Sequence, residues 1–181
     1  MNNCTSSFCC ALFLLLGVLT TSCQSEPGAK LNFVVCLGQS NMAGRGTFLE
    51  SDTTGTSNPK VLLWNDTGSW EPAVSPYNQY SNIRKDISMQ EIGPSEGMGD
   101  ILASHYDSIG LLVNAKGGSS ILEWKKGGDY YDQTLLRVKE AMQKGQLIGM
   151  VWHQGESDRK RAAEYNELLA QLIADFRSDV G

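Results

Sequence analysis

The sequence predicts an open, doubly wound α/β fold with a central parallel sheet, and three observations lead to it. Short apolar runs without polar alternation recur along the chain, as expected of parallel strands that are covered on both faces. Segments with the spacing of amphipathic helices lie between these runs, in the order strand, helix, strand, helix. Glycine, amide and hydroxyl residues follow three of the runs, at the sheet edge where such folds bind ligands.

Four apolar runs are the predicted strands, and the first of them is the most continuous. Each run is bounded by turn-forming residues and is short enough for one strand. The four strands are Leu31 to Leu37, Val61 to Trp64, Gly110 to Ala115 and Leu147 to Trp152.

Three segments have helical spacing, and two further segments are predicted loops. Met98 to Tyr106 is the first helix, and Tyr131 to Lys144 is the second, which Gly145 is placed to end. The third has one apolar stripe made by Tyr165, Leu168, Leu169, Leu172, Ile173 and Phe176. Residues 48–58 and 72–82 are polar and rich in turn formers, and we therefore expect loops there.

The N-terminus has the composition of an export signal. The first 25 residues contain no Asp, Glu, Lys or Arg, and residues 8–19 are mostly apolar but too few to cross a bilayer comfortably. Small residues precede Cys23, as in a bacterial lipoprotein signal. We therefore predict a signal peptide over residues 1–22, a lipid on Cys23 that attaches the protein to a membrane, a linker over residues 23–30, and one domain over residues 31–181. The protein would then be periplasmic or on the cell surface; the alternative is an apolar terminus without a targeting role.

Charge and cysteine content argue against nucleic-acid binding and against disulfide or thiol metal sites in the domain. The chain has 20 acidic and 15 basic residues and a net charge of −5, which disfavours binding to the phosphates of nucleic acid. Four of its five cysteines lie at or before Cys23, so that only Cys36 would stay inside the folded domain. Neither an internal disulfide nor a metal site made of thiols is expected there.

The stretch "GQSNMAG" follows the first predicted strand and places Ser40 on a strand-to-helix turn. A serine in this place has its hydroxyl lifted above the sheet edge, and its backbone N–H lies at a helix N-terminus that favours anions. Such a position suits a nucleophile. The alternative is that Ser40 only caps the helix. Met42 occupies the second glycine position of Gly-x-Ser-x-Gly, which disfavours the nucleophile elbow of that motif.

Two more polar stretches follow the last two predicted strands, "KGGSSILEW" and "HQGESD". Gly118 can present its backbone N–H without a Cβ in the way, and Gln154 has a side-chain amide of the right kind. Together with the Ser40 N–H they predict three donors for an oxyanion, which is the group that acyl transfer must stabilise. A tight turn and a surface amide are the structural alternatives for these two residues.

The three motifs in this order resemble the SGNH-type carbohydrate esterases of the sialate O-acetylesterase and acetylxylan esterase group, over roughly residues 31 to 176. The resemblance implies a three-layer α/β/α sandwich with a central parallel sheet, of the flavodoxin-like type. It implies Ser40 as nucleophile, and Ser40, Gly118 and Gln154 as oxyanion-hole donors. It also implies supporting roles for motif residues, with loop bracing assigned to the last two: Gly38, Gln39, Asn41, Glu156 and Asp158.

One part of the family pattern is absent from the sequence. The resemblance implies a late Asp-x-x-His block, whose histidine is the general base for the serine. The only histidines are His105, on a predicted helix, and His153, whose side chain should alternate in direction with that of Gln154. The predicted fold is therefore C-terminally incomplete, with an uncovered sheet edge, and the chain is either a fragment of a longer esterase or a truncated protein.

Two other segments have more than one interpretation. Trp124 and Lys125 could form a wall on which a sugar stacks, or Trp124 could pack beneath the loop. The stretch "GPSEGMGD", Gly93 to Asp100, is expected to shape the entry to a helix whose first turn carries Asp100.

The sequence therefore predicts a serine esterase that removes O-acetyl groups from carbohydrates, either sialic acid or acetylated plant polysaccharide. The predicted mechanism uses no metal and no other cofactor. A second hypothesis is a carbohydrate-binding or degenerate esterase that has lost its general base. A third is a flavodoxin-like nucleotide binder.

Overall fold

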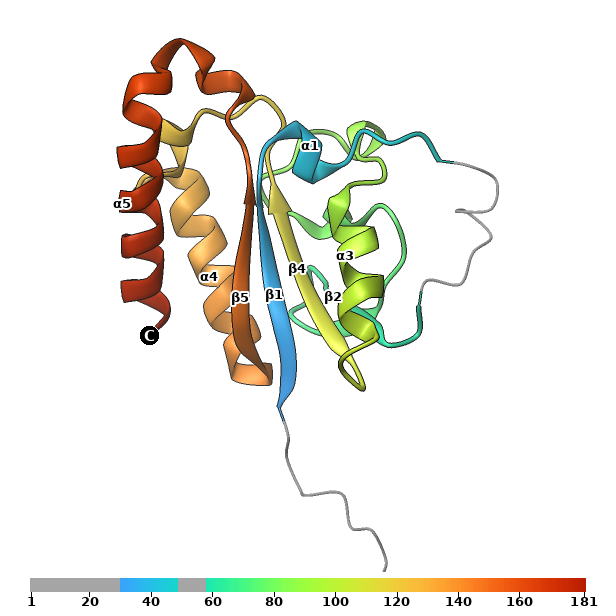
Figure 1. Ribbon diagram of the computed structural model, residues 1–181. Helices are drawn as coiled ribbons and strands as arrows, with labels where there is room; N and C mark the ends of the chain where they lie inside the picture. The colour runs from blue at the N-terminus through green and yellow to red at the C-terminus, as the bar shows by residue number, and fades with distance from the viewer. Residues whose placement is uncertain (1–29, 49–57) are drawn as a thin grey trace, which may run out of the picture.

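The computed structural model describes residues 30–48 and 58–181, which form a five-stranded sheet between two layers of helices (Figure 1). The predicted signal peptide, Cys23 and most of the linker lie outside the described residues, and so does most of the loop predicted over residues 48–58. The strands are β1 (Leu31–Gly38), β2 (Val61–Trp64), β3 (Trp70–Pro72), β4 (Ile109–Ala115) and β5 (Gly145–His153).

The strand order is β3-β2-β4-β1-β5, with β1 beside both β4 and β5. All four predicted strands are present and mutually parallel, which confirms the predicted parallel sheet. The fifth strand, β3, is antiparallel to β2 and was not predicted, because three residues are too few to show a pattern. Asn65 shapes the turn between them, since its Oδ1 accepts hydrogen bonds from the backbone N–H groups of Thr67 and Ser69.

Helices cover both faces of the sheet, so the predicted three layers are confirmed (Figure 1). The short α1 and α3 lie on one face, and α4 and α5 lie on the other. Single turns of 3-10 helix occupy the loops between them. The bounds are α1 (Ser40–Ala43), α3 (Pro94–Ala103), α4 (Asp129–Lys144), α5 (Ala162–Val180), η1 (Tyr77–Tyr80), η2 (Ile87–Met89), η3 (Ile121–Trp124) and η4 (Glu156–Arg161).

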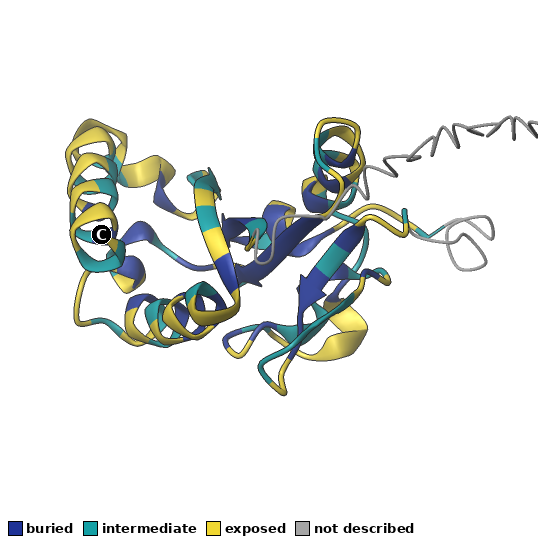
Figure 2. Cartoon of the chain, turned by 90° about the horizontal axis from the view of Figure 1, so that it is seen from below, coloured by how far each residue is buried: buried dark blue, intermediate teal, exposed yellow. Residues whose placement is uncertain are grey.

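The central strand β1 divides its side chains between two apolar clusters. Val34 and Cys36 face the α3 layer, whereas Phe33, Val35 and Leu37 face α4 and α5. Figure 2 shows this buried centre between helices whose outer faces are exposed. Each fully buried large apolar side chain contributes about 1.5 to 3 kcal/mol. This burial fixes β1 firmly, and with it the residues that follow its last position.

The helix α3 begins earlier than predicted. It starts at Pro94, so "GPSEGMGD" belongs to the helix from its second residue on, with Gly93 as the N-cap, and the first turn carries Glu96 rather than the predicted Asp100. Glu96 accepts hydrogen bonds from the backbone N–H groups of Gly93 and Tyr77, both at 3.0 Å, and these bonds favour the earlier start. His105 lies beyond the end of α3, in an exposed turn, and not on the helix as predicted.

The helix α5 has the predicted apolar stripe. Leu172 and Phe176 are buried in the apolar cluster on the α4 side of the sheet, and the other members of the stripe are half-buried. Beside it, β5 pairs only with β1 among the described strands, so the sheet ends at β5. Within residues 30–48 and 58–181, no helix combines the length and the apolar content that crossing a membrane requires.

Candidate active site

The carboxyl ends of β1, β4 and β5 lie side by side at one edge of the sheet. Gly38, the last residue of β1, is in register with Ala115 of β4 on one side and with His153 of β5 on the other. The three polar stretches therefore leave the sheet at the same level. This register agrees with the prediction that the three stretches lie close together in space.

Gly38 makes this close approach possible. A Cβ on this residue would lie only 2.0 Å from the carbonyl oxygen of His153, and the φ angle of Gly38 is +149°. The same carbonyl accepts a hydrogen bond from the backbone N–H of Gln39 at 3.0 Å. On the other side, the Lys116 N–H donates to the Gly38 carbonyl, also at 3.0 Å. The start of the next element is thus held from both neighbouring strands.

Ser40 is the first residue of α1, and Gln39 occupies the capping position before it. One interpretation of the sequence makes Ser40 only the helix cap, and the position of Gln39 shows that it is not. Ser40 is half-buried, and its Oγ accepts a long hydrogen bond of 3.5 Å from Gln39 Nε2. Among the described residues its backbone N–H has no partner. Both the hydroxyl and the N–H are therefore available to a ligand.

The Lys116 to Ser119 turn passes beside Ser40. A Cβ placed on the buried Gly117 would lie 3.8 Å from Ser40 Cβ. The exposed Gly118 has a φ of +79°, and its N–H has no hydrogen-bond partner within the described part of the chain. The turn thus brings a second unpaired N–H to the neighbourhood of the serine.

Gln154 connects all three strand ends through its side-chain amide. Its Nε2 lies 2.8 Å from the Ser119 carbonyl oxygen, 2.5 Å from Asp158 Oδ2 and 3.2 Å from Gln39 Oε1. The amide has two hydrogens for these three acceptors. Gln154 therefore already uses its donors, and donation to an oxyanion would require exchange of one of these bonds, of which the bond to Gln39 is the longest.

Asp158 is the buried anchor of the same cluster. Its carboxylate accepts hydrogen bonds from Ser120 Oγ at 2.6 Å and the Ile121 N–H at 2.7 Å, and it pairs with Arg161 Nε at 2.9 Å. Burial raises the pKa of Asp158, but these bonds and Gln154 outweigh it, so the pKa lies below the ordinary value. The ionised carboxylate thus ties the loop after β4 to the loop after β5.

Two further contacts join the serine segment to η4. Asn41 Nδ2 donates a hydrogen bond to Glu156 Oε1. The backbone N–H of Ser157 donates to Gln39 Oε1 at 3.2 Å. The predicted supporting residues on both sides of the site are therefore in direct contact with each other.

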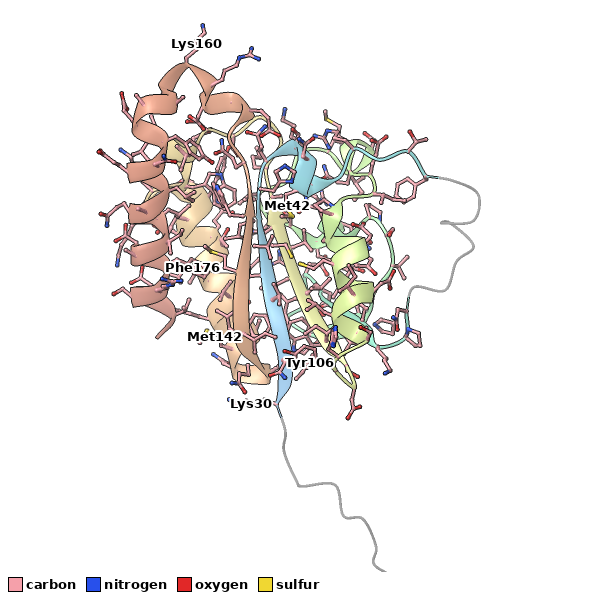
Figure 3. All side chains as sticks on the ribbon, in the orientation of Figure 1. Lys30, Met42, Tyr106, Met142, Lys160 and Phe176 are labelled. Carbon is pink, nitrogen blue, oxygen red and sulfur yellow. The ribbon has the colours of Figure 1, made fainter. Side chains whose placement is uncertain are left out.

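Neither histidine contacts Ser40 within the described residues. His153 ends β5 with its side chain exposed, and its backbone carbonyl is the group that faces Gly38. His105 lines a hollow with Lys30 and Tyr106 at the amino end of β1, the opposite end of the strand from Ser40 (Figure 3). Neither histidine is therefore placed to act as the general base for Ser40.

Trp124 packs under the loop and is not a sugar-facing wall. It is 1% exposed, and its Nε1 donates to Ser119 Oγ at 3.0 Å. Its ring lies edge-on against that of Trp152, with centroids 5.3 Å apart. The packed alternative of the sequence analysis is therefore the correct one.

Sequence reasoning did not assign a site role to Tyr165. It appears in the sequence only as one member of the α5 apolar stripe. In the structure its hydroxyl lies 2.7 Å from both the backbone oxygen and the Oε1 of Gln154, and it accepts a hydrogen bond from Trp152 Nε1 at 3.1 Å. Tyr165 thereby orients the Gln154 amide so that Nε2 faces the other strand ends. Within residues 30–48 and 58–181, no group of His, Cys, Asp or Glu is arranged to hold a metal ion.

Comparison with known proteins identifies the family. The family model described as carbohydrate esterase, sialic acid-specific acetylesterase, matches residues 30–181. The chain belongs to this family. The match covers every strand and helix described above and confirms the family resemblance seen in the three motifs.

A plant protein extends this result. A protein named probable carbohydrate esterase from Arabidopsis thaliana is 27% identical over 163 residues, which are 79% of this chain and 62% of the relative. The chain thus spans less than two thirds of that relative's length. The crystal structure of the same plant protein gives a TM-score of 0.73 at 25% identity, over 84% of this chain and 70% of the plant chain.

A carbohydrate acetylesterase from Xanthomonas citri has the same fold. Its crystal structure gives a TM-score of 0.54 at 19% identity. The likeness covers 81% of this chain and 38% of the Xanthomonas chain. This likeness shows the shared fold.

Proposed function

We propose that this chain is a serine esterase that removes O-acetyl groups from carbohydrates, with Ser40 as its nucleophile. The observation that carries the proposal is the position of Ser40 at the end of the central strand. Its hydroxyl does not cap the helix, and among the described residues the backbone N–H groups of Ser40 and of nearby Gly118 have no partner. The family description, which names an acetylesterase, supports the choice of acyl group.

The proposed reaction has two steps. Ser40 Oγ attacks the ester carbonyl and gives up its proton to water, and the carbonyl oxygen becomes an anion that the N–H groups of Ser40 and Gly118 stabilise. The C–O bond to the sugar then breaks, and the sugar oxygen takes up a proton from water, which leaves an acetyl-serine and a free sugar hydroxyl. In the second step a water oxygen attacks the acetyl carbonyl, the bond to Ser40 Oγ breaks, Oγ regains a proton and acetic acid leaves. Asp158 and Gln154 keep the three loops in place while this happens.

Hydrolysis of p-nitrophenyl acetate and of an acetylated xyloside tests the proposal. We expect Ser40→Ala to lose at least about a thousandfold in kcat, since removal of a nucleophile leaves only binding and the oxyanion donors. Ser104→Ala is the matched control, because Ser104 is an exposed serine at the end of α3. Equal rates for the parent chain and Ser40→Ala would contradict the proposal.

A carbohydrate-binding protein without turnover is the second candidate. It is favoured by one observation, the absence of a histidine contact to Ser40 among the described residues. The same experiment distinguishes the two candidates. Binding of the acetylated xyloside without release of acetate would support the second one.

A further inference from the structure

Gln39 precedes the proposed nucleophile, and its side chain contacts the reacting oxygen. The Gln39 Nε2 atom lies 3.5 Å from Ser40 Oγ. The side chain is only 3% exposed, although glutamine is usually found at the protein surface. A buried amide keeps hydrogen-bond partners at both of its ends. What Gln39 can do for Ser40 therefore depends on which end of the amide faces the serine.

The oxygen end of the Gln39 amide fixes its orientation. The Ser157 backbone nitrogen lies 3.2 Å from Gln39 Oε1, and a backbone N–H can only donate, so the atom that faces it must be the oxygen. Gln154 Nε2 is a second donor to the same oxygen, also at 3.2 Å. A flipped amide would place its NH₂ group against two donors. The end that faces Ser40 is therefore the nitrogen.

The main chain of Gln39 is held as firmly as its side chain. Its N–H donates to the His153 carbonyl of β5 at 3.0 Å, and its carbonyl accepts from the Ala43 N–H of α1 at 2.9 Å. The residue is thus tied to β5, to α1 and, through Oε1, to η4. A donor that is oriented before the reaction begins needs no reorganisation when charge develops beside it.

A donor at Ser40 Oγ acts on the charge that this oxygen carries. Hydrogen bonding to the ionised form of a group favours that form. A hydrogen bond to a charged atom is stronger than one between neutral atoms, and burial strengthens it further. The 3.5 Å contact of the resting serine is long, as catalytic hydrogen bonds often are before the transition state, and it can shorten as Oγ becomes negative.

We propose that Gln39 is a catalytic residue whose Nε2 stabilises the negative charge on Ser40 Oγ. The inference rests on the proposed esterase function and adds a residue to its mechanism. In the first step the donor favours release of the Ser40 proton to water as Oγ attacks. In the second step the bond from Oγ to the acetyl carbon breaks, Oγ keeps the electron pair, and Nε2 stabilises this charge until Oγ regains a proton. The N–H groups of Ser40 and Gly118 act on a different atom, the carbonyl oxygen.

The rate at which a fluorophosphonate labels Ser40 tests this role without turnover of an ester. The reagent forms a bond from Oγ to phosphorus and releases fluoride, and mass spectrometry of the Ser40 peptide follows the reaction. We expect the rate constant to fall about 10- to 100-fold in Gln39→Met, as for loss of a hydrogen bond to a charged group. The kcat for p-nitrophenyl acetate should fall by a similar factor with little change in KM. Gln79→Met is the matched control, because Gln79 Nε2 donates to the Val74 carbonyl, and its rates should equal those of the parent chain.

Gln39→Glu separates the donor from the rest of the side chain. The new carboxyl keeps the shape, and its Oε1 can still accept from the Ser157 N–H and from Gln154, which favours the ionised form. At about pH 9, well above the ordinary glutamate pKa of about 4.3, an anion then replaces the donor beside Oγ. We expect a loss of labelling rate at least as large as in Gln39→Met.

Three results would overturn the inference. The first is a parent chain that is labelled no faster than Ser40→Ala. The second is a folded Gln39→Met that is labelled at the parent rate. The third is Gln39→Glu labelled as fast as the parent chain, which would mean that Gln39 acts only through Oε1. Melting temperatures show which variants fold, and if Gln39→Met does not fold, Gln39→Glu decides.

Failure of the proposed function has a different signature. It would appear as no turnover of p-nitrophenyl acetate above that of Ser40→Ala, in a parent chain whose Ser40 is still labelled. Slower labelling in the Gln39 variants would then support the action of Gln39 on Oγ, although the chain is not an esterase. Conversely, turnover that depends on Ser40 but not on Gln39 would overturn this inference and leave the esterase function in place.

Discussion

The structure contains two polar clusters, each built around one buried charged side chain, Asp158 in one and Arg137 in the other. The Asp158 cluster consists of Ser119, Ser120, Gln154, Asp158 and Tyr165 and lies at the carboxyl ends of β1, β4 and β5. The Arg137 cluster consists of Asn82, Asn114, Thr134 and Arg137 and joins β4 to α4 and to the end of β2. Neither has a buried side-chain N or O without a partner among the described residues.

The two clusters differ in whether the buried charge has a counter-ion and in which loops its hydrogen bonds reach. The Asp158 carboxylate has Arg161 as a counter-ion and reaches Gln39 through Gln154. Arg137 instead donates to neutral oxygens, Asn114 Oδ1 and the Trp64 carbonyl, both at 3.0 Å. Burial lowers the pKa of Arg137 to about 10, and Glu140 and Asp66 offset this only in part, so it stays charged near neutral pH. A buried charge alone therefore does not point to the candidate site, whereas a connection to Gln39, next to Ser40, does.

Replacing Arg137 should have the largest effect on stability. Arg137→Leu leaves Asn114 Oδ1 and the Trp64 carbonyl without this donor, and we expect a loss of about 3 kcal/mol in the free energy of unfolding, measured in urea. Esterase activity per folded molecule should remain, because the cluster does not touch Ser40. Lys139→Gln on the same helix is the control. A loss below about 0.5 kcal/mol would show that the cluster is dispensable.

Asp158→Asn should affect both stability and activity. The variant keeps the shape of the side chain but removes the charge that Arg161 and three donors bind, and we expect a loss of about 2 kcal/mol in urea. Because the loops after β4 and β5 would loosen together, kcat should fall more than in Arg137→Leu. Stability loss with full activity would contradict the assigned bracing role.

The same carboxylate predicts a pH dependence. The pKa of Asp158 in the folded protein lies below its ordinary value of about 3.9, so the folded state favours the ionised form. This contribution to stability is present above pH 4 and is lost as the pH falls through the folded pKa. Unfolding curves between about pH 6 and pH 3 should therefore show a smaller acid destabilisation in Asp158→Asn than in the parent chain. Identical pH profiles would exclude a linked proton at this residue.

Tyr165→Phe should have the smallest effect of the series on stability. It removes one hydroxyl that holds the Gln154 amide and accepts from Trp152, at a cost of about 1 kcal/mol. With the amide free to flip, kcat should fall several-fold while KM changes little. Tyr106→Phe, near the opposite end of β1 (Figure 3), is the matched control. A change in KM alone would mean that Tyr165 acts on substrate binding.

The sequence predicted the layered fold and the meeting point of the motifs because these depend on periodicity and on strand ends. Leu31 to Leu37 is apolar at nearly every position, and the order of the elements limits the topology. The antiparallel β3 escaped prediction because its pairing depends on a turn shaped by Asn65. The helix start at Pro94 escaped because the bonds to Glu96 are visible only in three dimensions.

Details of the site were less predictable, because each depends on contacts between distant segments. Trp124 is a sugar-facing residue in one interpretation and a packing residue in the other, and only its contact with Trp152 decides. Tyr165 has the same apolar spacing as its neighbours on α5, and nothing in the spacing shows where its hydroxyl points. The catalytic roles of Ser40, Gly118 and Gln154 remain predictions.

Because the His153 carbonyl lies against Gly38 and accepts the Gln39 N–H, the position of Ser40 depends on the register of β5 against β1. A slip of β5 by one residue would remove the carbonyl that receives the Gln39 N–H and would tilt the first turn of α1. Substitutions near the start of β5 that shift its register would therefore displace Ser40, although they lie at the other end of the strand.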